Sequence, residues 1–208
     1  MAASTDLTTK AACKTKMGIS GTDDDDFIDA LIDECSEKIE LYLGRKFAKA
    51  QYTEYFDPDD CPDGVIKVSN PPINKNSADL VRTQSDVETY ITVHQDTTRE
   101  WSSSLGAVDD ANLYVIPTAG IIRSAVGFAE GDYFGSIKVV YYGGYATIPD
   151  ALAHACEAQV AEWFQMDTEA AWGKSSESES GASVSWHDHG DLSPKVLDML
   201  ELFDLRAE

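Results

Sequence analysis

The chain has 208 residues and a formal net charge of −21, with 37 acidic residues against 16 lysines and arginines. This charge argues against a protein that grips nucleic acid through its phosphates, because such binding needs clustered basic residues. A hydrophobic content of 43%, with 10% aromatic residues, is enough for a packed core and argues against wholesale disorder. No apolar run approaches the length of a membrane span.

The amino terminus and the cysteines favour a chain made in a reducing cytosol. The first sixteen residues, MAASTDLTTKAACKTK, lack the apolar centre of a secretory signal, so we expect the mature chain to start near Met1. The cysteines are far apart and form no CxxC pair, which favours free thiols over a disulfide scaffold or a zinc site. A disulfide between two cysteines that are distant in sequence but adjacent in the folded chain stays open as the alternative. The four are Cys13, Cys35, Cys61 and Cys156.

Two helices are predicted at the start of the chain. The first covers residues 7–17, with Thr8 or Thr9 as its N-cap and Gly18 as its terminator. The second lies within residues 23–47, where we expect Thr22 to cap the start and Gly44 to provide a left-handed stop. Its apolar residues recur at intervals of three and four and form one continuous stripe on a helix. The stripe consists of Phe27, Ile28, Leu31, Ile32, Cys35, Ile39, Tyr42 and Leu43.

From residue 47 the pattern changes to the alternation that is typical of strands. Strands are predicted at 52–56 and 65–69, on either side of an acidic segment, 57–64, that is rich in turn-forming residues. Short strands at this spacing indicate a small antiparallel sandwich or barrel. Further strand-like runs lie at 79–82, 87–95, 112–116, 120–123 and 136–142, and the polar segment 97–111 is expected to loop outward.

Two more helices are predicted in the last third of the chain. Pro149 opens the first, whose apolar side contains small alanines that permit close packing. Ser193 and Pro194 begin the final helix. Between these helices, residues 167–191 are rich in Ser, Glu and Gly, so we expect a mobile loop there.

The order of elements predicts an α+β fold. An antiparallel bundle of about four helices is expected from residues 1–47 and 146–208. Residues 48–145 then form an inserted, antiparallel β-rich module that resembles a sandwich or a barrel.

Motif searches single out no catalytic site. The acidic turn fails as a calcium-binding EF-hand loop, because counting from Asp57 places Cys61 at position five, Pro62 at six and Val68 at twelve. The chain has no G-x-S-x-G nucleophile elbow, no phosphate-binding P-loop and no dinucleotide fingerprint. The sequence therefore gives weak support to an enzyme.

The histidines offer one alternative. His187 and His189, separated by Asp188, could place two imidazoles on one side of an extended segment as metal ligands. Spacing ties no third ligand to them, so we predict no metal and no cofactor, and a metal-dependent hydrolase remains the alternative. His154 is expected to be packed or exposed rather than catalytic, and His94 carries no accompanying motif.

Several short sequence segments occur in an order that resembles that of a known protein family. IELYLGRKF at residues 39–47 is followed by YTEYFD at 52–57 and VIKVSNPPI at 65–73. IKVVYYGGYATIPDALAHA at 137–155 joins a strand to an alanine-rich helix, and LSPKVLDMLELF at 192–203 is the closing helix. Together they resemble the head–tail connector (adaptor, or head-completion) proteins of tailed bacteriophages. The insertion at 71–143 and the segment 167–191 are longer than in the smallest members, which favours a more elaborate subtype.

The resemblance implies a virion structural protein rather than an enzyme, with no catalytic residues and no obligatory cofactor. Many copies would form a ring beneath the portal, as a homododecamer that matches the portal's symmetry, and would extend the DNA channel between head and tail. The implied partners are the portal protein and tail or further head-completion proteins, with no membrane. The implied location is the head–tail junction of the virion, after assembly in the host cytoplasm.

The negative charge suits such a channel, because an acidic wall repels DNA phosphates and lets DNA pass without specific binding. An alternative is an acidic binding module that mimics DNA. Mimicry needs acidic residues spaced regularly on one exposed face, and the only such cluster, residues 23–26, is already explained by the positive end of a helix dipole.

The end of the chain is the predicted portal contact. Leu202, Phe203, Leu205 and Arg206 include more apolar residues than a terminal helix with one buried face needs. The alternative, that these residues simply close the core, is equally open.

Overall fold

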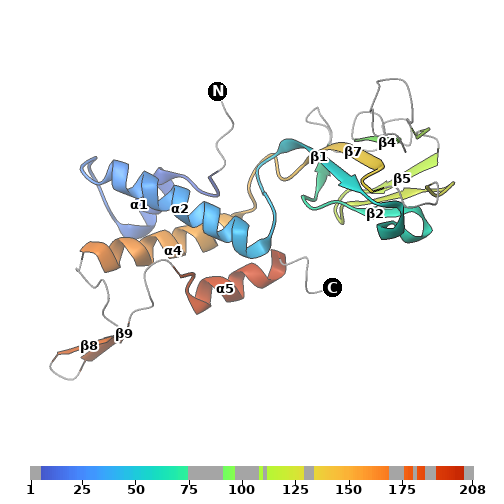
Figure 1. The fold of residues 1–208 in the computed structure, drawn as a ribbon. Coiled ribbons are helices and arrows are strands. Elements are labelled where there is room, and N and C mark those ends of the chain that lie inside the picture. The colour runs from blue at the N-terminus through green and yellow to red at the C-terminus, as the bar shows by residue number, and fades with distance from the viewer. Residues whose placement is uncertain are drawn as a thin grey trace. The chain divides into compact units, whose positions relative to one another are not determined.

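The structure is a computed structural model that describes residues 6–74, 91–96, 108–109, 112–128, 134–168, 176–179, 182–185 and 191–203. The chain divides into two compact units. Met1–Arg45 and Ile148–Glu208 form the first, here called the helical unit, and Lys46–Thr147 form the second, here called the β unit (Figure 1). Within the described segments, no helix combines the length and apolar character that crossing a membrane would require.

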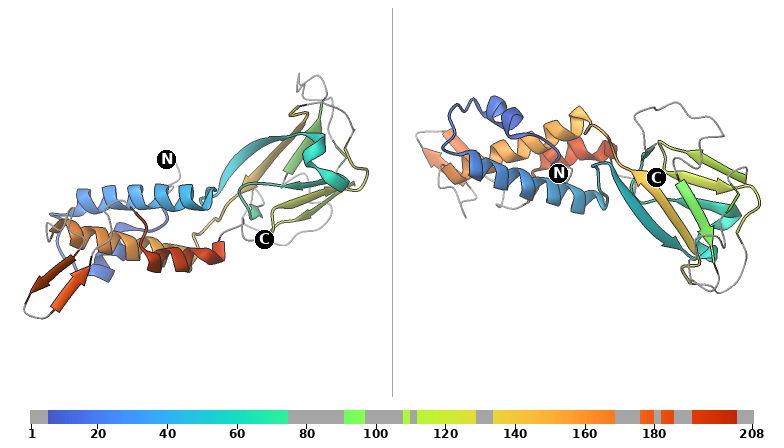
Figure 2. Two further views of the ribbon diagram at one scale, coloured as in Figure 1. Left: turned by 60° about the horizontal axis from the view of Figure 1, so that its bottom comes forward. Right: turned by 90° about the horizontal axis from the view of Figure 1, so that it is seen from above.

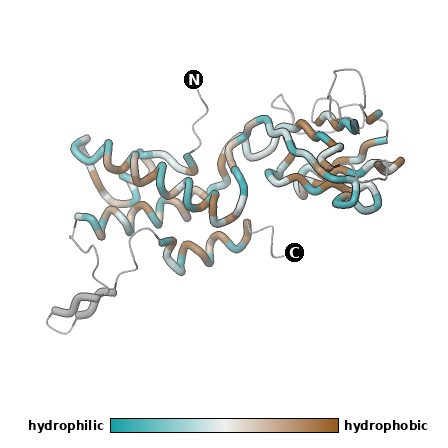
Figure 3. Tube along the Cα trace, in the orientation of Figure 1, coloured by the Kyte–Doolittle hydropathy of each residue, from teal (hydrophilic) through white to brown (hydrophobic). Residues whose placement is uncertain are grey.

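The helical unit is organised around α4, which packs against α1, α2 and α5 (Figure 2). Apolar residues of all four helices form the interior, while each helix also has hydrophilic residues, as the colours in Figure 3 show. The expected antiparallel helical bundle is therefore confirmed. The helices are α1 (Lys10–Met17), α2 (Asp25–Leu43), α4 (Asp150–Thr168) and α5 (Pro194–Leu200), and the 3₁₀ turn η5 (Glu201–Phe203) follows α5.

Helix caps set the ends of the first two helices much as the sequence predicts. The Thr9 hydroxyl accepts a hydrogen bond from the Ala12 amide at 3.3 Å, so Thr9 is the N-cap of α1. Gly18 and Gly44 end α1 and α2 in the left-handed conformation, with φ of 70° and 66°. Glycine adopts this conformation without steric cost, which is why both helices stop there.

The prediction that Thr22 caps α2 is wrong. The helix begins at Asp25, and Asp24 occupies the N-cap position without a side-chain hydrogen bond. The Thr22 carbonyl instead accepts from the Asp25 amide at 3.2 Å, which places Thr22 in a turn before the helix. The carboxylates of Asp25 and Asp26 in the first turn interact favourably with the positive end of the helix dipole, so a hydroxyl cap is not needed.

The β unit contains two antiparallel sheets. In the first sheet β7 (Ile137–Gly143) is central, with β1 (Ala50–Phe56) on one side and β3 (Ile73–Asn74) and β4 (Ile91–Gln95) on the other. The sequence does not predict strand β3, since the two prolines before it indicate the end of the preceding strand. Its two residues pair with Gly143 and Tyr142.

The second sheet has β6 (Ile121–Ser124) between β2 (Val65–Lys67) and β5 (Leu113–Ile116). Two 3₁₀ turns, η1 (Pro58–Asp60) and η2 (Pro62–Gly64), precede β2 and form the acidic segment. The inward side chains of the two sheets share a single core, so the β unit is a sandwich. Its buried members include Ile66, Val93, Leu113, Val115, Ile122, Ile137, Val139 and Tyr141.

The expected loop at 167–191 is wrong in part. Strands β8 (Ser176–Glu179) and β9 (Ala182–Ser185) pair as an antiparallel ribbon. The two runs flank Ser180 and Gly181, a dipeptide that favours a turn, and this signal outweighs the low-complexity composition. The strand predicted at 79–82 lies outside the described residues, as does most of the predicted loop at 97–111.

Candidate assembly surfaces

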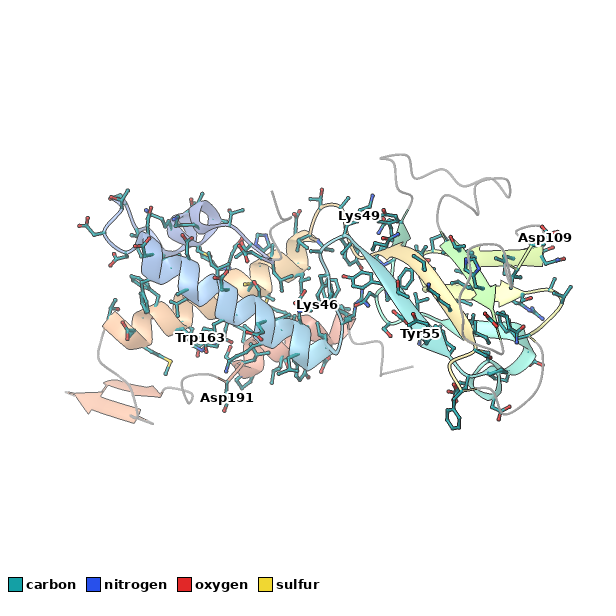
Figure 4. The ribbon with its side chains drawn as sticks, turned by 45° about the horizontal axis from the view of Figure 1, so that its top comes forward. Lys46, Lys49, Tyr55, Asp109, Trp163 and Asp191 are labelled. Carbon is teal, nitrogen blue, oxygen red and sulfur yellow. The ribbon has the colours of Figure 1, made fainter. Side chains whose placement is uncertain are left out.

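Large hydrophobic side chains remain exposed at several places in the described part of the chain. They matter because contiguous apolar surface on a soluble protein marks sites of interaction. Those on the β unit are Tyr55, which Figure 4 labels on β1, with Tyr114, Ile116, Val126 and Phe134, and those on the helical unit are Leu41, Tyr42 and Leu202.

The outward face of the β2–β6–β5 sheet is apolar where polar residues are expected. Antiparallel sheets with one face on a core usually alternate apolar residues inward with polar residues outward. Tyr114 and Ile116 of β5 point outward and are 53% and 54% exposed. They lie beside Arg123 and Ile121 of β6 in the ladder. A hollow of about 640 Å³ lies on this face, here called the outer sheet face, and is lined by Val65, Tyr114, Ile116, Ile121, Arg123 and Ala125.

The outer sheet face carries positive charge. Arg123 lies between Val65 and Tyr114 across the three strands, and Lys67 lies beside Ile121 in the next row. Both basic residues are exposed, and neither makes an ion pair or a side-chain hydrogen bond with any described residue. None of the described residues that line the hollow is acidic. Within the described part of the β unit, this face therefore presents cations without a partner on an apolar background.

A second hollow of about 530 Å³ lies between the two 3₁₀ turns and residues 126–128. Asp59 and Asp63 contribute exposed carboxylates that pair with no described residue. Val126, which is 71% exposed, and Phe128 contribute apolar surface. This hollow, here called the acidic groove, thus combines negative charge with apolar contact area.

Close backbone packing forms one wall of the acidic groove. A Cβ on Gly64 would lie 2.8 Å from the Ser124 carbonyl oxygen, so only glycine lets η2 approach the end of β6 this closely. The Ser124 hydroxyl donates to the Gly127 carbonyl at 2.9 Å and fixes the following turn. Among the described residues no cluster of three acidic, histidine or cysteine side chains is arranged to hold a metal ion.

The predicted portal contact is only partly described. Leu202 is 86% exposed and Phe203 is half-buried in η5, whereas Val196 and Leu200 of α5 are buried in the helical core. Leu202 therefore does not close the core. Leu205 and Arg206 lie outside the described residues.

Negative charge is concentrated in the helical unit. Its segments contain 23 acidic and 8 basic residues, a net charge of −15, whereas the β unit contains 14 and 8, a net charge of −6. Part of the charge is paired, since the Lys10 ammonium lies 2.7 Å from the Asp29 carboxylate and Lys14 binds Asp25. The hydrogen bond from Lys14 holds the pKa of Asp25 below its usual value.

Hydrogen bonds to two carboxylates, which the sequence did not indicate, join segments that are distant in sequence within each unit. Glu157 of α4 is buried and accepts from the Thr8 hydroxyl at 3.2 Å and from the His154 ring at 3.0 Å, which joins the α1 region to α4. In the β unit, the Glu54 carboxylate accepts from the Ser69 amide and from the Tyr141 hydroxyl, and this ties β1 to the segment after β2. No sequence motif distinguishes these carboxylates from the many exposed ones.

The structure does not test the histidine pair of the hydrolase alternative. His187 and His189 lie outside the described residues. His154 is largely exposed and bonded to Glu157, as its place on a helix predicts. Burial, together with the nearby Lys138, lowers the pKa of His94, so this imidazole is neutral at pH 7.

The four cysteines are free and buried. Burial raises the pKa of Cys13 to about 12 and that of Cys61 to about 11, and the pKa of Cys35 is raised by its hydrogen bond with Cys156 and by burial. Because the thiolate is the reactive form, we expect no thiol to react with an aromatic disulfide reagent in the native protein. The denatured protein should release four equivalents as the control. Rapid labelling of one equivalent under native conditions would contradict the placement of these side chains.

The fold is similar to that of chains in two solved structures of particle necks. One solved chain, from "Neck of empty GTA particle computed with C6 symmetry", matches with a TM-score of 0.54 and 11% identity, covering 93% of this chain and 87% of that one. Another, from "Neck of native GTA particle computed with C12 symmetry", gives a TM-score of 0.50 and 12% identity over 89% and 92%. A comparison with curated proteins gives no match.

A family model identifies the chain more specifically. The model of the head completion protein family matches residues 6–204, which is nearly the whole chain. The chain belongs to the head completion protein family. The predicted resemblance is thereby confirmed, together with a structural role in joining head and tail. Nothing in these comparisons supports the metal-dependent hydrolase or the DNA mimic.

Proposed function

We propose that the chain is the subunit of a closed ring that sits beneath the portal at the head–tail junction and extends the channel for DNA. Membership of the head completion protein family over residues 6–204 carries this proposal. The solved neck assemblies with six- and twelvefold symmetry support a ring as the form in which the fold works. We take twelve copies as the proposed number, with the virion as the final location and the host cytoplasm as the place of assembly.

The charge distribution supports the channel. With a net charge of −15 in the helical unit, a ring would concentrate negative charge many times over. Such a wall repels phosphates at short range, and its excess of acidic over basic residues disfavours tight binding, so DNA slides through. The protein acts as a passive structural part in this proposal and catalyses no reaction.

Mass measurement on the protein mixed with its portal tests the stoichiometry. Twelve copies of a 22.7 kDa chain would add about 270 kDa to the portal. We expect this increment, and we expect the portal alone to retain its own mass. An increment corresponding to one or two copies, or none, would rule out the ring.

Truncation after Leu200 tests the portal contact. Leu202 is 86% exposed and Phe203 half-buried, so their loss removes little of the core, and the truncated chain should remain folded. We expect it to lose binding to the portal in a co-sedimentation assay, with a change in the thermal unfolding midpoint of only a few degrees.

An exposed leucine elsewhere in the helical unit gives the matched control. Leu41 of α2 is 80% exposed, so Leu41→Ala removes similar apolar surface from a different place. Leu202→Ala should weaken portal binding and Leu41→Ala should not. Unfolding of the truncated chain would instead assign the carboxyl-terminal segment to the core.

A further inference from the structure

The outer sheet face is a surface that needs a partner. Its outward positions on β5 and β6 hold Tyr114, Ile116 and Ile121, where a solvated antiparallel sheet would have polar residues. The hollow has a volume of about 640 Å³, and its lining includes Arg123, which pairs with no described residue. Apolar area with a polar rim is the composition of a protein interface.

The charge on this face restricts how two copies could use it. In a twofold-symmetric dimer both copies use the same surface for the contact. The Arg123 and Lys67 side chains of the two copies would therefore be brought together. Like charges opposed in an interface cost binding energy. The face is therefore unsuited to pairing with itself and suited to an acidic surface.

The acidic groove of the same unit has the matching composition. Asp59 and Asp63 supply carboxylates that pair with no described residue, and Val126 and Phe128 supply apolar contact area. The two surfaces thus carry opposite charge, and each includes apolar side chains. A contact between different surfaces of two copies is heterologous, which is the type of contact that closes a ring.

We propose that the outer sheet face of one subunit docks against the acidic groove of the next copy of this chain, with Arg123 opposite Asp59. This inference rests on the proposed ring and names the surfaces that join its neighbouring β units. Tyr114 and Ile116 would be buried at the centre of the contact, where aromatic and aliphatic anchors contribute most of the binding energy. Lys67 and Asp63 would lie at its rim.

Charge reversal tests the contact directly. Arg123→Glu should raise the protein concentration needed for half-maximal ring formation by about tenfold or more, since it opposes two carboxylates. Asp59→Arg should have a similar effect. When both changes are made in the same chain, every contact in the ring regains an opposite pair, so assembly should recover. Asp59 is preferred to Asp63 because Asp63 has a φ of 57°, which an arginine adopts less readily.

Two controls separate the contact from general effects of charge and folding. Lys195→Glu makes the same change in charge at an exposed position of the helical unit and should leave ring formation unchanged. Ile116→Asp should impair assembly, while Thr92→Asp on the outward face of the other sheet should not. Thermal unfolding of each variant should match the wild type.

The outcomes distinguish this contact from the ring itself. If Arg123→Glu and Asp59→Arg form rings at the same protein concentration as the wild type, the proposed contact is wrong. The proposal that the chain forms a ring is then not contradicted. Impaired single variants that the double variant does not rescue would overturn the pairing of these two surfaces. Rings that form normally but fail to bind the portal would assign the outer sheet face to the portal instead. Absence of rings or portal-bound copies in the wild type would overturn the contact and the ring together.

Discussion

Trp163→Ala is expected to lower the free energy of unfolding of the helical unit by about 3–5 kcal/mol, the range for truncating a large buried aromatic residue. The Trp163 side chain is 1% exposed on α4, the helix that contacts the other three helices of the unit (Figure 4). The Lys38 ammonium of α2 lies 5.7 Å from the centre of the indole ring and adds a cation–π attraction of about 0.5–1 kcal/mol.

Urea titration followed by circular dichroism would measure this effect. Trp163→Phe keeps most of the apolar volume and should cost clearly less. Leu41→Ala, at an 80% exposed position of α2, should be close to neutral. A Trp163→Ala protein with wild-type stability would show that α4 is not the centre of the helical core.

Gly144→Ala is expected to destabilise the β unit by about 3–5 kcal/mol, because it combines backbone strain with overpacking. Gly144 has a φ of 86°, which disfavours any residue with a Cβ. An added Cβ would lie 2.6 Å from the Ala48 carbonyl oxygen and 2.7 Å from that of Phe47. Both contacts are to backbone atoms, which cannot rotate away as a side chain would.

Gly127→Ala separates the two causes. Gly127 has a φ of 70° and lies in the same unit, but an added Cβ there meets no atom within 4 Å. It should therefore show only the cost of the left-handed conformation, about 1–2 kcal/mol. Equal losses in the two variants would contradict the close packing of Gly144 against the segment 47–48.

The same variants test whether each of the two units unfolds independently of the other. We propose that the helical and β units unfold separately. Gly144→Ala should then accelerate amide hydrogen exchange in β1 and β7 while α2 and α4 keep their protection, and Trp163→Ala should do the reverse. Parallel loss of protection in both units would contradict this proposal.

Much of the fold follows from local signals in the sequence. The stripe of α2 with Gly44 behind it, and the alternation along β1 and β7, each satisfy the period of one element type, so helix and strand were distinguished correctly. The missed features depend on partners distant in sequence. Strand β3 has only two residues and exists because β7 offers a free edge, which no pattern in residues 73–74 can reveal.

The assembly surfaces were harder to foresee for a similar reason. The run LYVI is continuously apolar, which is a signal for a strand covered on both faces, whereas IIRS begins with two isoleucines and ends with two polar residues. As strands of a small sandwich they predict the correct fold, but they give no indication that one face of the sheet leaves large apolar side chains exposed. The pairing of Tyr114 with Arg123 and of Ile116 with Ile121 makes this surface visible only in the folded chain.

Electron cryomicroscopy of the protein bound to its portal tests the central claim most directly. We predict a closed ring of twelve copies beneath the portal, coaxial with it, around an open channel. Portal particles without added density, or with copies attached at scattered positions and no closed ring, would contradict the account.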